Sequence, residues 1–144
     1  MSEARSAQGT FISKGDGTSP EQFEEIAEVV SIGGPNETSD EIETTHLRSP
    51  GGYREFLQSF KDGGECPLVL NFIPNDETQD SQTGLRSEFQ TGAQKNYRIT
   101  FPDGTTCTFL AFVKAVGTAI AVGDKLSLNV TLRIIGATAW DEAA

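Results

Sequence analysis

The sequence is poor in the residues from which most active sites are built. Its 144 residues include one histidine (His46), one tryptophan (Trp140) and two cysteines, Cys66 and Cys107. One histidine and two distant cysteines have no metal-ligand spacing. Both cysteines lie in apolar, strand-like runs where a thiolate is disfavoured, so we expect two buried, reduced thiols, with a disulfide as the alternative. The sequence therefore predicts no catalytic residue, no metal ligand and no cofactor.

Basic residues and long apolar runs are also scarce. The chain has 11 Lys and Arg against 21 Asp and Glu, for a formal net charge of −10. Ordinary nucleic-acid binding depends on basic patches, which this balance argues against. No apolar run reaches the roughly 18 residues of a membrane-spanning helix, and the polar start MSEARSAQG does not have the pattern of a secretory signal. We therefore expect a soluble protein that has no membrane partner.

Acidic and glycine-rich stretches do not complete a ligand site. Asp76, Glu77 and Asp80 lack the loop spacing and the glycine of an EF-hand, so they are expected to begin a solvated helix. The glycine pairs at 51–52 and 63–64 are not followed by the Lys-Ser/Thr of a phosphate-binding loop. These observations favour a structural or interaction protein over an enzyme.

The clearest pattern in the sequence is the alternation of its last third. In KLSLNVTLRIIG, five apolar residues alternate with five polar ones, which predicts a strand with one buried and one solvent-exposed face. The predicted buried face comprises Leu126, Leu128, Val130, Leu132 and Ile134. Strands are also predicted for NYRITF, which ends in a Pro102–Gly104 turn, and for the apolar run TCTFLAFVKAV.

The first half predicts shorter elements. TFISKG, residues 39–46 and residues 66–74 favour strands; in 39–46, Glu41 and Glu43 share one face and Ile42 lies on the other. Residues 75–92 favour a helix that begins at Asn75 or Asp76 and ends at Gly92. The segment 21–32 fits a helix and a strand equally well.

Many strands, frequent turns and one helix indicate a mainly β fold. We predict an antiparallel β-sandwich or barrel with a single flanking α-helix. The expected organisation is a flexible N-terminal arm (1–8), one domain (9–140) that contains a long loop at 46–65, and a C-terminal tail (141–144). Trp140 is expected to pack at an edge or at an interface.

The order of several short motifs resembles the major tail tube proteins of lambda-like long-tailed (siphovirus) bacteriophages. These are Phe-x-x-Ile-x-x-Val-x-Ser-Ile-Gly-Gly-Pro at 23–35, EIETTHL at 41–47, PGGYREF at 50–56 and FKDGGE at 60–65. A Leu-x-Leu-x-Phe strand, a short helix and a Pro-Asp-Gly hairpin follow. The resemblance extends over residues 9–136, and its specificity lies in the order of the motifs rather than in any one of them.

The resemblance implies a structural virion protein with a β-sandwich core whose copies build a tube. Six copies form a ring in which the sheets join into one barrel, and the rings stack into a conduit with an acidic lumen for DNA ejection. By the same resemblance, segment 21–32 is a strand, and both residues 1–8 and the loop 46–65 contact neighbouring subunits. The resemblance also implies a virion-tail location, assembly in the host bacterial cytoplasm, transient passage of DNA, and three partners, which are the tape measure, tail tip and tail terminator proteins.

The resemblance also assigns candidate residues to these surfaces. Glu41 and Glu43 are the candidates for the lumen, with an ordinary solvated outer face as the alternative. The candidates for the inter-ring or inter-subunit loop are basic and aromatic residues, which are His46, Arg48, Tyr53, Arg54, Phe56, Phe60 and Lys61.

Two other functions remain open at this point. A tube protein of a contractile tail, or of a related secretion device, would share the fold and would be distinguished by a sheath partner. A monomeric β-sandwich binding module, for instance for sugars, would present clustered aromatic residues on one face, whereas this chain has one tryptophan and two tyrosines.

Overall fold

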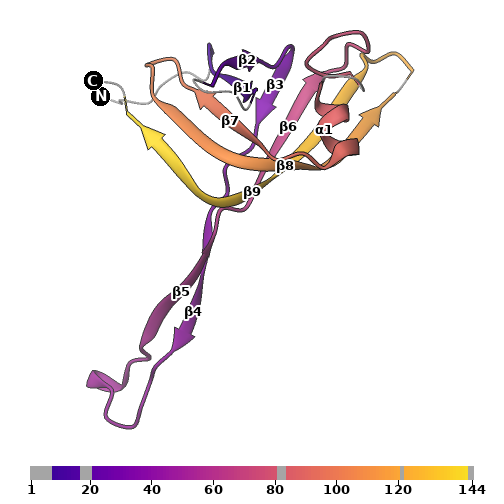
Figure 1. Cartoon of the computed structure of the whole chain (residues 1–144). Helices are drawn as coiled ribbons and strands as arrows, with labels where there is room; N and C mark the ends of the chain where they lie inside the picture. Colours follow the sequence, from indigo (N-terminus) through magenta and orange to yellow (C-terminus); the bar gives the residue numbers. More distant parts are fainter. Residues whose placement is uncertain (1–7, 17–20, 81–83, 121, 143–144) are drawn as a thin grey trace, which may run out of the picture.

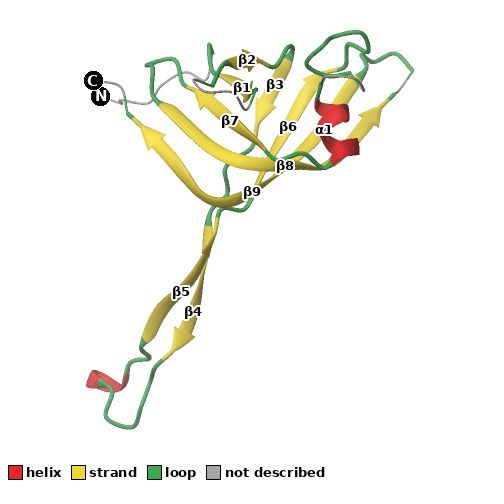
Figure 2. Cartoon of the chain, in the orientation of Figure 1, coloured by secondary structure: helices red, strands yellow, loops and turns green. Residues whose placement is uncertain are grey.

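The computed structural model describes residues 8–16, 21–80, 84–120 and 122–142, which form a seven-stranded antiparallel sheet, one α-helix and a projecting two-stranded hairpin (Figures 1 and 2). The elements are β1 (Phe11–Gly15), β2 (Phe23–Glu25), β3 (Val29–Ile32), β4 (Thr38–Glu43), a 3-10 turn (Pro50–Gly52), β5 (Phe56–Asp62), β6 (Glu65–Asn71), α1 (Leu85–Thr91), β7 (Lys95–Thr100), β8 (Thr106–Ala119) and β9 (Ser127–Asp141). The order in the large sheet is β2-β1-β7-β8-β9-β6-β3, while β4 and β5 pair only with each other.

The large sheet is bent by its two longest strands. β8 and β9 have 14 and 15 residues, and their pairing shifts register at Thr108/Leu110 and again at Val113/Ala115. Such bulges increase the local twist and bend a sheet, so its two ends turn toward each other. The mainly β, antiparallel fold with one helix is confirmed. Among the described residues the sheet does not close into a barrel.

The core lies on the concave face of this sheet and follows the predicted alternation. Leu128, Val130, Leu132 and Ile134 are all buried, because residues two apart on a strand point to the same side. Leu126, which precedes β9, is half-exposed instead. The other buried apolar residues are Ile12, Ile26, Cys66, Leu68, Leu70, Leu85, Tyr97, Ile99, Cys107, Phe109, Ala111 and Val113.

The two edge strands of the sheet, β2 and β3, are consecutive in the chain. The Ile26 amide donates to the Ile12 carbonyl at 2.9 Å, and the Asn71 amide donates to the Glu28 carbonyl at 2.8 Å. Residues 26–28 therefore bridge the two edges. Segment 21–32 is extended, as the resemblance implied, but it forms two short strands, because Glu28 has a φ of 60° that interrupts the extended chain.

A fully buried glutamine fixes this bridge. The Gln79 amide nitrogen donates to the carbonyls of Ala27 and Asn71, both at 3.0 Å, and its oxygen accepts the Ile73 amide at 2.9 Å. One side chain thus satisfies three backbone groups from two segments of the chain. Without it, these groups would lose hydrogen bonds in a site with little water.

The helix is shorter than the sequence predicted. It begins at Leu85, with Gly84 as its N-cap, rather than at Asn75 or Asp76, and it ends at a left-handed Gly92 as expected. Residues 75–80 form turns, because the Asp76 carboxylate accepts the amide of Thr78 at 2.8 Å and stabilises a local turn. The predicted positions 81–83 lie outside the described residues.

The remaining predictions concern the thiols and the termini. Cys66 and Cys107 are free and buried, and burial raises their pKa values to about 12 and about 11. Residues 1–7 and 143–144 lie outside the described part of the chain, and β9 extends to Asp141, the first position of the predicted tail. No described helix is long and apolar enough to span a membrane.

Candidate assembly surface

β4, β5 and the residues between them form a hairpin arm (residues 38–62) that projects from the body (Figure 1). All nine candidate residues named from the sequence lie on this hairpin arm. The prediction of a loop over 46–65 is wrong for 56–62, which is β5, and for Glu65, which begins β6. The apolar positions of 56–62 do not alternate, because neither face of this strand is buried and burial therefore does not select apolar residues on one side.

The pairing of β4 with β5 decides which side chains share a face. Glu41 lies opposite Gln58, Glu43 opposite Phe56, and Ser39 opposite Lys61, which places these residues on one face. Ile42 and Leu57 face each other on the opposite side. The shared face of Glu41 and Glu43 is confirmed, but it also carries an aromatic ring and a lysine.

The hairpin arm exposes large apolar side chains. Leu47, Phe60 and Tyr53 are 107%, 84% and 78% exposed, and Ile42, Phe56 and Leu57 are each more than half exposed. A two-stranded hairpin has no core in which to bury them. Contiguous exposed apolar surface marks an interaction site. Leu47, Ile42 and Leu57 are not among the candidates predicted from the sequence. Leu47 and Ile42 are isolated apolar residues in an otherwise polar segment, and Leu57 follows Phe56, which are the signals that could have indicated them.

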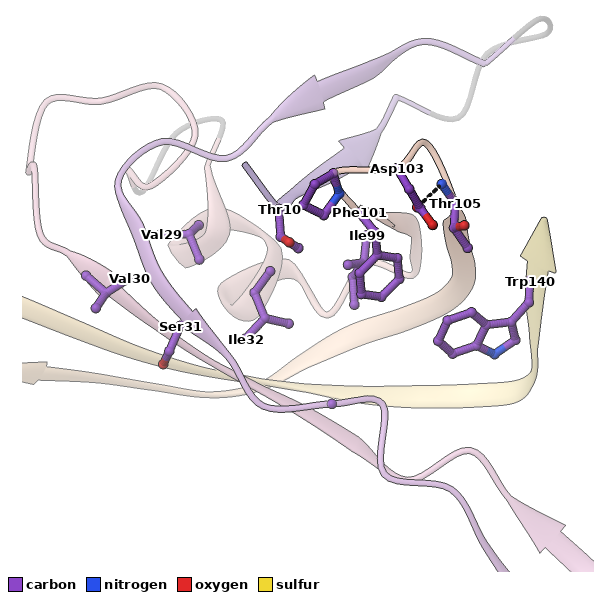
Figure 3. Close-up of a pocket in the computed structure, with 12 residues that line it drawn as sticks. Thr10, Val29, Val30, Ser31, Ile32, Ile99, Phe101, Asp103, Thr105 and Trp140 are labelled. Carbon is purple, nitrogen blue, oxygen red and sulfur yellow. Dashed lines mark hydrogen bonds between the residues drawn. The ribbon is translucent and has the colours of Figure 1, made fainter. Parts of the chain in front are cut away.

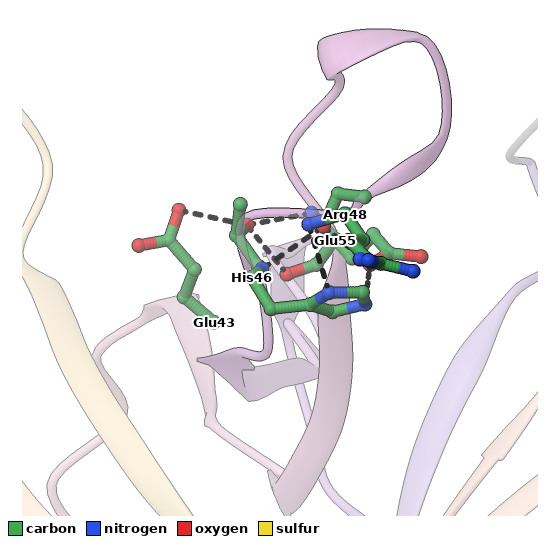
Figure 4. A network of polar contacts seen from close by, with 6 residues as sticks. Glu43, His46, Arg48 and Glu55 are labelled. Carbon is green, nitrogen blue, oxygen red and sulfur yellow. Dashed lines mark hydrogen bonds and ion pairs between the residues drawn. The ribbon is translucent and has the colours of Figure 1, made fainter.

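The tip of the hairpin arm, residues 44–55, is ordered by its own polar contacts (Figure 4). The His46 amide donates to Ser49 Oγ at 2.9 Å, and Ser49 Oγ donates to Glu55 Oε2 at 2.7 Å. His46 Nε2 lies 3.4 Å from the same carboxylate oxygen, and His46 Nδ1 accepts the Arg48 amide at 3.2 Å. The predicted candidates His46 and Arg48 thus take part in the contacts that shape the tip.

The two lumen candidates differ in their surroundings. Glu43 accepts the Thr45 hydroxyl at 3.3 Å and lies 3.7 Å from Arg54 Nε. Arg54 is itself one of the predicted candidates, and its charge partly offsets that of Glu43. Glu41 is exposed and faces the neutral Gln58, so it presents the less compensated negative charge of the two.

The base of the hairpin arm is fixed to the sheet. Arg133 donates to Asp62 at 2.8 Å, and this bond, with the Gly64 amide, lowers the pKa of Asp62. Gly64 has a φ of +77°, and its carbonyl accepts the Ile134 amide at 2.9 Å. A side chain at Gly64 would lie 1.8 Å from the Asn36 carbonyl oxygen. The Gly63–Gly64 pair therefore allows a close approach between two chain segments.

An apolar hollow of about 540 Å³ opens on the body, between β3, the β7–β8 turn and the end of β9 (Figure 3). Ile32, Ile99 and Phe101 line it together with Trp140. Trp140 stacks on Phe101 with 5.9 Å between ring centroids and remains 50% exposed. The expected edge packing of Trp140 is confirmed, while half of its ring is still open to solvent.

Comparisons with known proteins identify relatives of the chain. A family model described as "Lambda phage tail tube protein, TTP" matches residues 8–141. No curated protein matches the chain.

Several solved structures share the fold. They include the tail of an empty gene transfer agent particle refined with C6 symmetry (TM-score 0.78, 22% identity, 96% of this chain and 100% of that chain). A sheath/tube terminator structure of an extracellular contractile injection system has a TM-score of 0.73 at 15% identity, over 99% of both chains. The SPP1 tail tube has a TM-score of 0.72 at 13% identity, over 97% of this chain and 80% of that chain.

Proposed function

The chain belongs to the lambda phage tail tube protein family, and from this premise we propose that six copies form each ring and that the hairpin arm links copies to one another. Its role as a structural tail tube protein, whose copies stack in rings to form the tube of a phage-like tail, follows from the family. The number six and the role of the hairpin arm are the proposed part. A heterologous contact between different surfaces of identical subunits gives rings or open stacks.

The observation that carries this proposal is the exposed apolar surface of the hairpin arm. Six large apolar side chains of residues 42–60 are at least half exposed, and the hairpin points away from the body (Figure 1). Because the base is held by Gly64 and by the Asp62–Arg133 pair, the hairpin arm does not fold back over its own sheet. A second copy is the partner that can cover this surface.

A shortened hairpin tests the proposal. Residues 40–60 are replaced by Asn-Gly, so that the paired residues Ser39 and Lys61 are joined by a two-residue turn. The core is not touched, and we expect a folded protein that stays monomeric where the full chain forms six-fold rings and tubes. Size-exclusion chromatography measures whether the protein is folded and monomeric, and negative-stain microscopy shows whether rings and tubes form. Tubes of normal geometry from the shortened chain would contradict the role of the hairpin arm.

We propose further that Glu41 and Glu43 contribute negative charge to the lumen. Both lie on one face of β4, so a ring would repeat this charge in every copy. DNA carries one negative charge per roughly 1.7 Å of its axis, and an anionic wall lets it slide where a cationic wall would hold it. Of the two, Glu41 has the less compensated charge, because Glu43 lies beside Arg54.

Charge reversal tests the lumen proposal. Glu41→Lys with Glu43→Lys is expected to build tubes but to slow DNA release, most strongly at low salt, since charges are screened over about 8 Å at physiological ionic strength. Glu25→Lys with Glu142→Lys changes the net charge equally at two other exposed positions and serves as the control. Equal ejection by both variants at every salt concentration would place Glu41 and Glu43 outside the lumen.

The wider setting of the protein is proposed from the family. We propose assembly in the host bacterial cytoplasm onto a tail tip and around a tape measure protein, closure by a tail terminator, and a purely structural role without catalysis. A contractile tail is the second candidate, because a contractile injection system is among the similar folds. Co-purification of a sheath protein with the tubes would favour the contractile alternative.

A further inference from the structure

The apolar hollow on the body has no occupant from its own chain among the described residues. It is lined by Ile32, Ile99 and Phe101, and the half-exposed ring of Trp140 stands at its edge (Figure 3). Its volume of about 540 Å³ lies within the roughly 300–1,000 Å³ of pockets that receive a ligand-sized group. An apolar hollow with an exposed tryptophan at its edge fits an apolar anchor better than a polar ligand.

The tip of the hairpin arm presents an anchor of this kind. Leu47 and Tyr53 are the most exposed apolar side chains of residues 44–55. Hydrogen bonds among His46, Ser49 and Glu55 connect the two sides of the backbone that carries them (Figure 4). A tip that already has such internal bonds has less conformational entropy to lose on docking, which favours binding.

Charge also matches the tip to the hollow. Arg48 follows Leu47 in the chain and is exposed, whereas Asp103 lies in the lining at the β7–β8 turn. Arg54 is the weaker contributor, because it already lies 3.7 Å from Glu43. An arginine beside an apolar anchor complements an apolar hollow with a carboxylate in its lining, and such pairing sets orientation and specificity. The other groove, at the base of the hairpin arm, also includes Trp140 but is otherwise lined mostly by polar and charged residues such as Glu37 and Asp62, which makes it a poorer match for Leu47 and Tyr53.

The tip does not reach the hollow of its own chain. β5 alone has seven residues, which at about 3.3 Å each carry the tip roughly 23 Å from the base. The Gly64–Ile134 hydrogen bond and the Asp62–Arg133 pair hold that base, and the hairpin points away from the body (Figure 1). The occupant must come from another molecule.

The geometry points to a second copy of this chain as that molecule: Leu47 and Tyr53 of one copy insert into the hollow formed by Ile32, Phe101 and Trp140 of the next. The contact is heterologous, because every copy offers one tip and one hollow, so it propagates from copy to copy. The inference rests on the proposed function, since it names the surface that receives the hairpin arm.

Directed cross-linking tests the contact. Tyr53→Cys protein is mixed with Thr105→Cys protein, whose new thiol lies in the lining of the hollow, under a mild thiol oxidant. The native thiols of Cys66 and Cys107 are buried and should not compete. The control pairs Tyr53→Cys with Ala119→Cys, which puts an exposed thiol at the opposite end of β8 from Thr106. We expect the mixed disulfide dimer to form at least tenfold faster with Thr105→Cys than with Ala119→Cys.

The only tryptophan of the chain gives a second, independent readout. Trp140 fluorescence should shift to shorter wavelength and become protected from acrylamide when copies associate, because its open half is covered. Leu47→Ala with Tyr53→Ala should abolish this change and weaken association by about tenfold or more. This inference would be overturned if tubes form, Trp140 fluorescence is still quenched by acrylamide as in the monomer, and cross-linking shows no preference for Thr105→Cys. That result would leave the tube function standing. Selective cross-linking in a chain that forms no tubes would support the contact and refute the proposed tube arrangement.

Discussion

The close approach of Gly64 to Asn36, at the base of the hairpin arm, gives the sharpest test of the structure. Gly64 and Gly136 have the same φ of +77°, so replacement by alanine costs each roughly 1–2 kcal/mol for the left-handed backbone. At Gly136 the added Cβ meets nothing within 4 Å. At Gly64 it would lie 1.8 Å from the Asn36 carbonyl oxygen, so that segment must move by at least about 1.2 Å to reach the 3.0 Å limit of real contacts.

Separation of Gly64 from Asn36 disturbs the hydrogen bonds on both sides of this contact. The Asn36 amide donates to the Glu65 carbonyl at 3.3 Å, and the Ile134 amide donates to the Gly64 carbonyl at 2.9 Å. Each hydrogen bond contributes about 1 kcal/mol net. Gly64→Ala should therefore lower the free energy of unfolding by roughly 3–4 kcal/mol, against about 1–2 kcal/mol for the matched control Gly136→Ala.

Equilibrium urea unfolding measures this difference. With a slope of about 1–3 kcal/mol per molar urea, a difference of 2 kcal/mol separates the two midpoints by roughly 1 M. Gly64→Ala should also fail to assemble, because the hairpin arm leaves the sheet at a different angle, whereas Gly136→Ala should assemble. Coincident midpoints and normal tubes from Gly64→Ala would refute the idea that this contact fixes the hairpin arm.

Three further predictions concern the core and the base of the hairpin arm. Gln79→Leu should cost about 2–4 kcal/mol in urea unfolding, because three backbone groups lose their partner; an unchanged midpoint would contradict this. Cys66 and Cys107 should resist thiol reagents at pH 8 unless urea is present. Their folded pKa values are raised to about 12 and about 11, so the stability that they contribute should fall as pH rises above the ordinary thiol pKa of about 8.5. The loss should reach up to about 1.4 kcal/mol per pH unit for each thiol. Rapid labelling of the folded protein would argue against their burial. Arg133→Gln should raise the pKa of Asp62, as followed by NMR titration, because the hydrogen bond that lowers this pKa is lost. In the parent chain this bond stabilises the base of the hairpin arm above the ordinary carboxyl pKa, and the stabilisation is lost as pH falls through the pKa of Asp62 in the folded protein.

The sequence by itself determined the elements whose two faces differ. The alternation at 128–134 predicted β9 and its buried face, because side chains two apart on a strand share a side and burial selects apolar residues there. The apolar runs around Cys66 and Cys107 predicted buried thiols for the same reason. The order of motifs also led to the correct family before any geometry was known.

Tertiary structure alone decided the shape of the candidate surface. Residues 56–62 are a strand only because β4 lies beside them and exchanges backbone hydrogen bonds with them, and neither strand buries a face that a periodic sequence pattern could reveal. The helix likewise starts ten residues after Asn75. Asp76 accepts the Thr78 amide in a local turn, and Gln79 donates to the Ala27 carbonyl, a backbone group that only the fold brings near.

The tip of the hairpin arm and the apolar hollow are further surfaces that the sequence alone could not predict. Leu47 and Trp140 are far apart in sequence and isolated among small or polar neighbours, so no local pattern joins them. Long-range strand pairing places one at the end of a projecting hairpin and the other beside an apolar hollow. Local sequence fixes which face of a strand is apolar, but the partners of that strand, and hence the surfaces left uncovered, depend on contacts between distant segments.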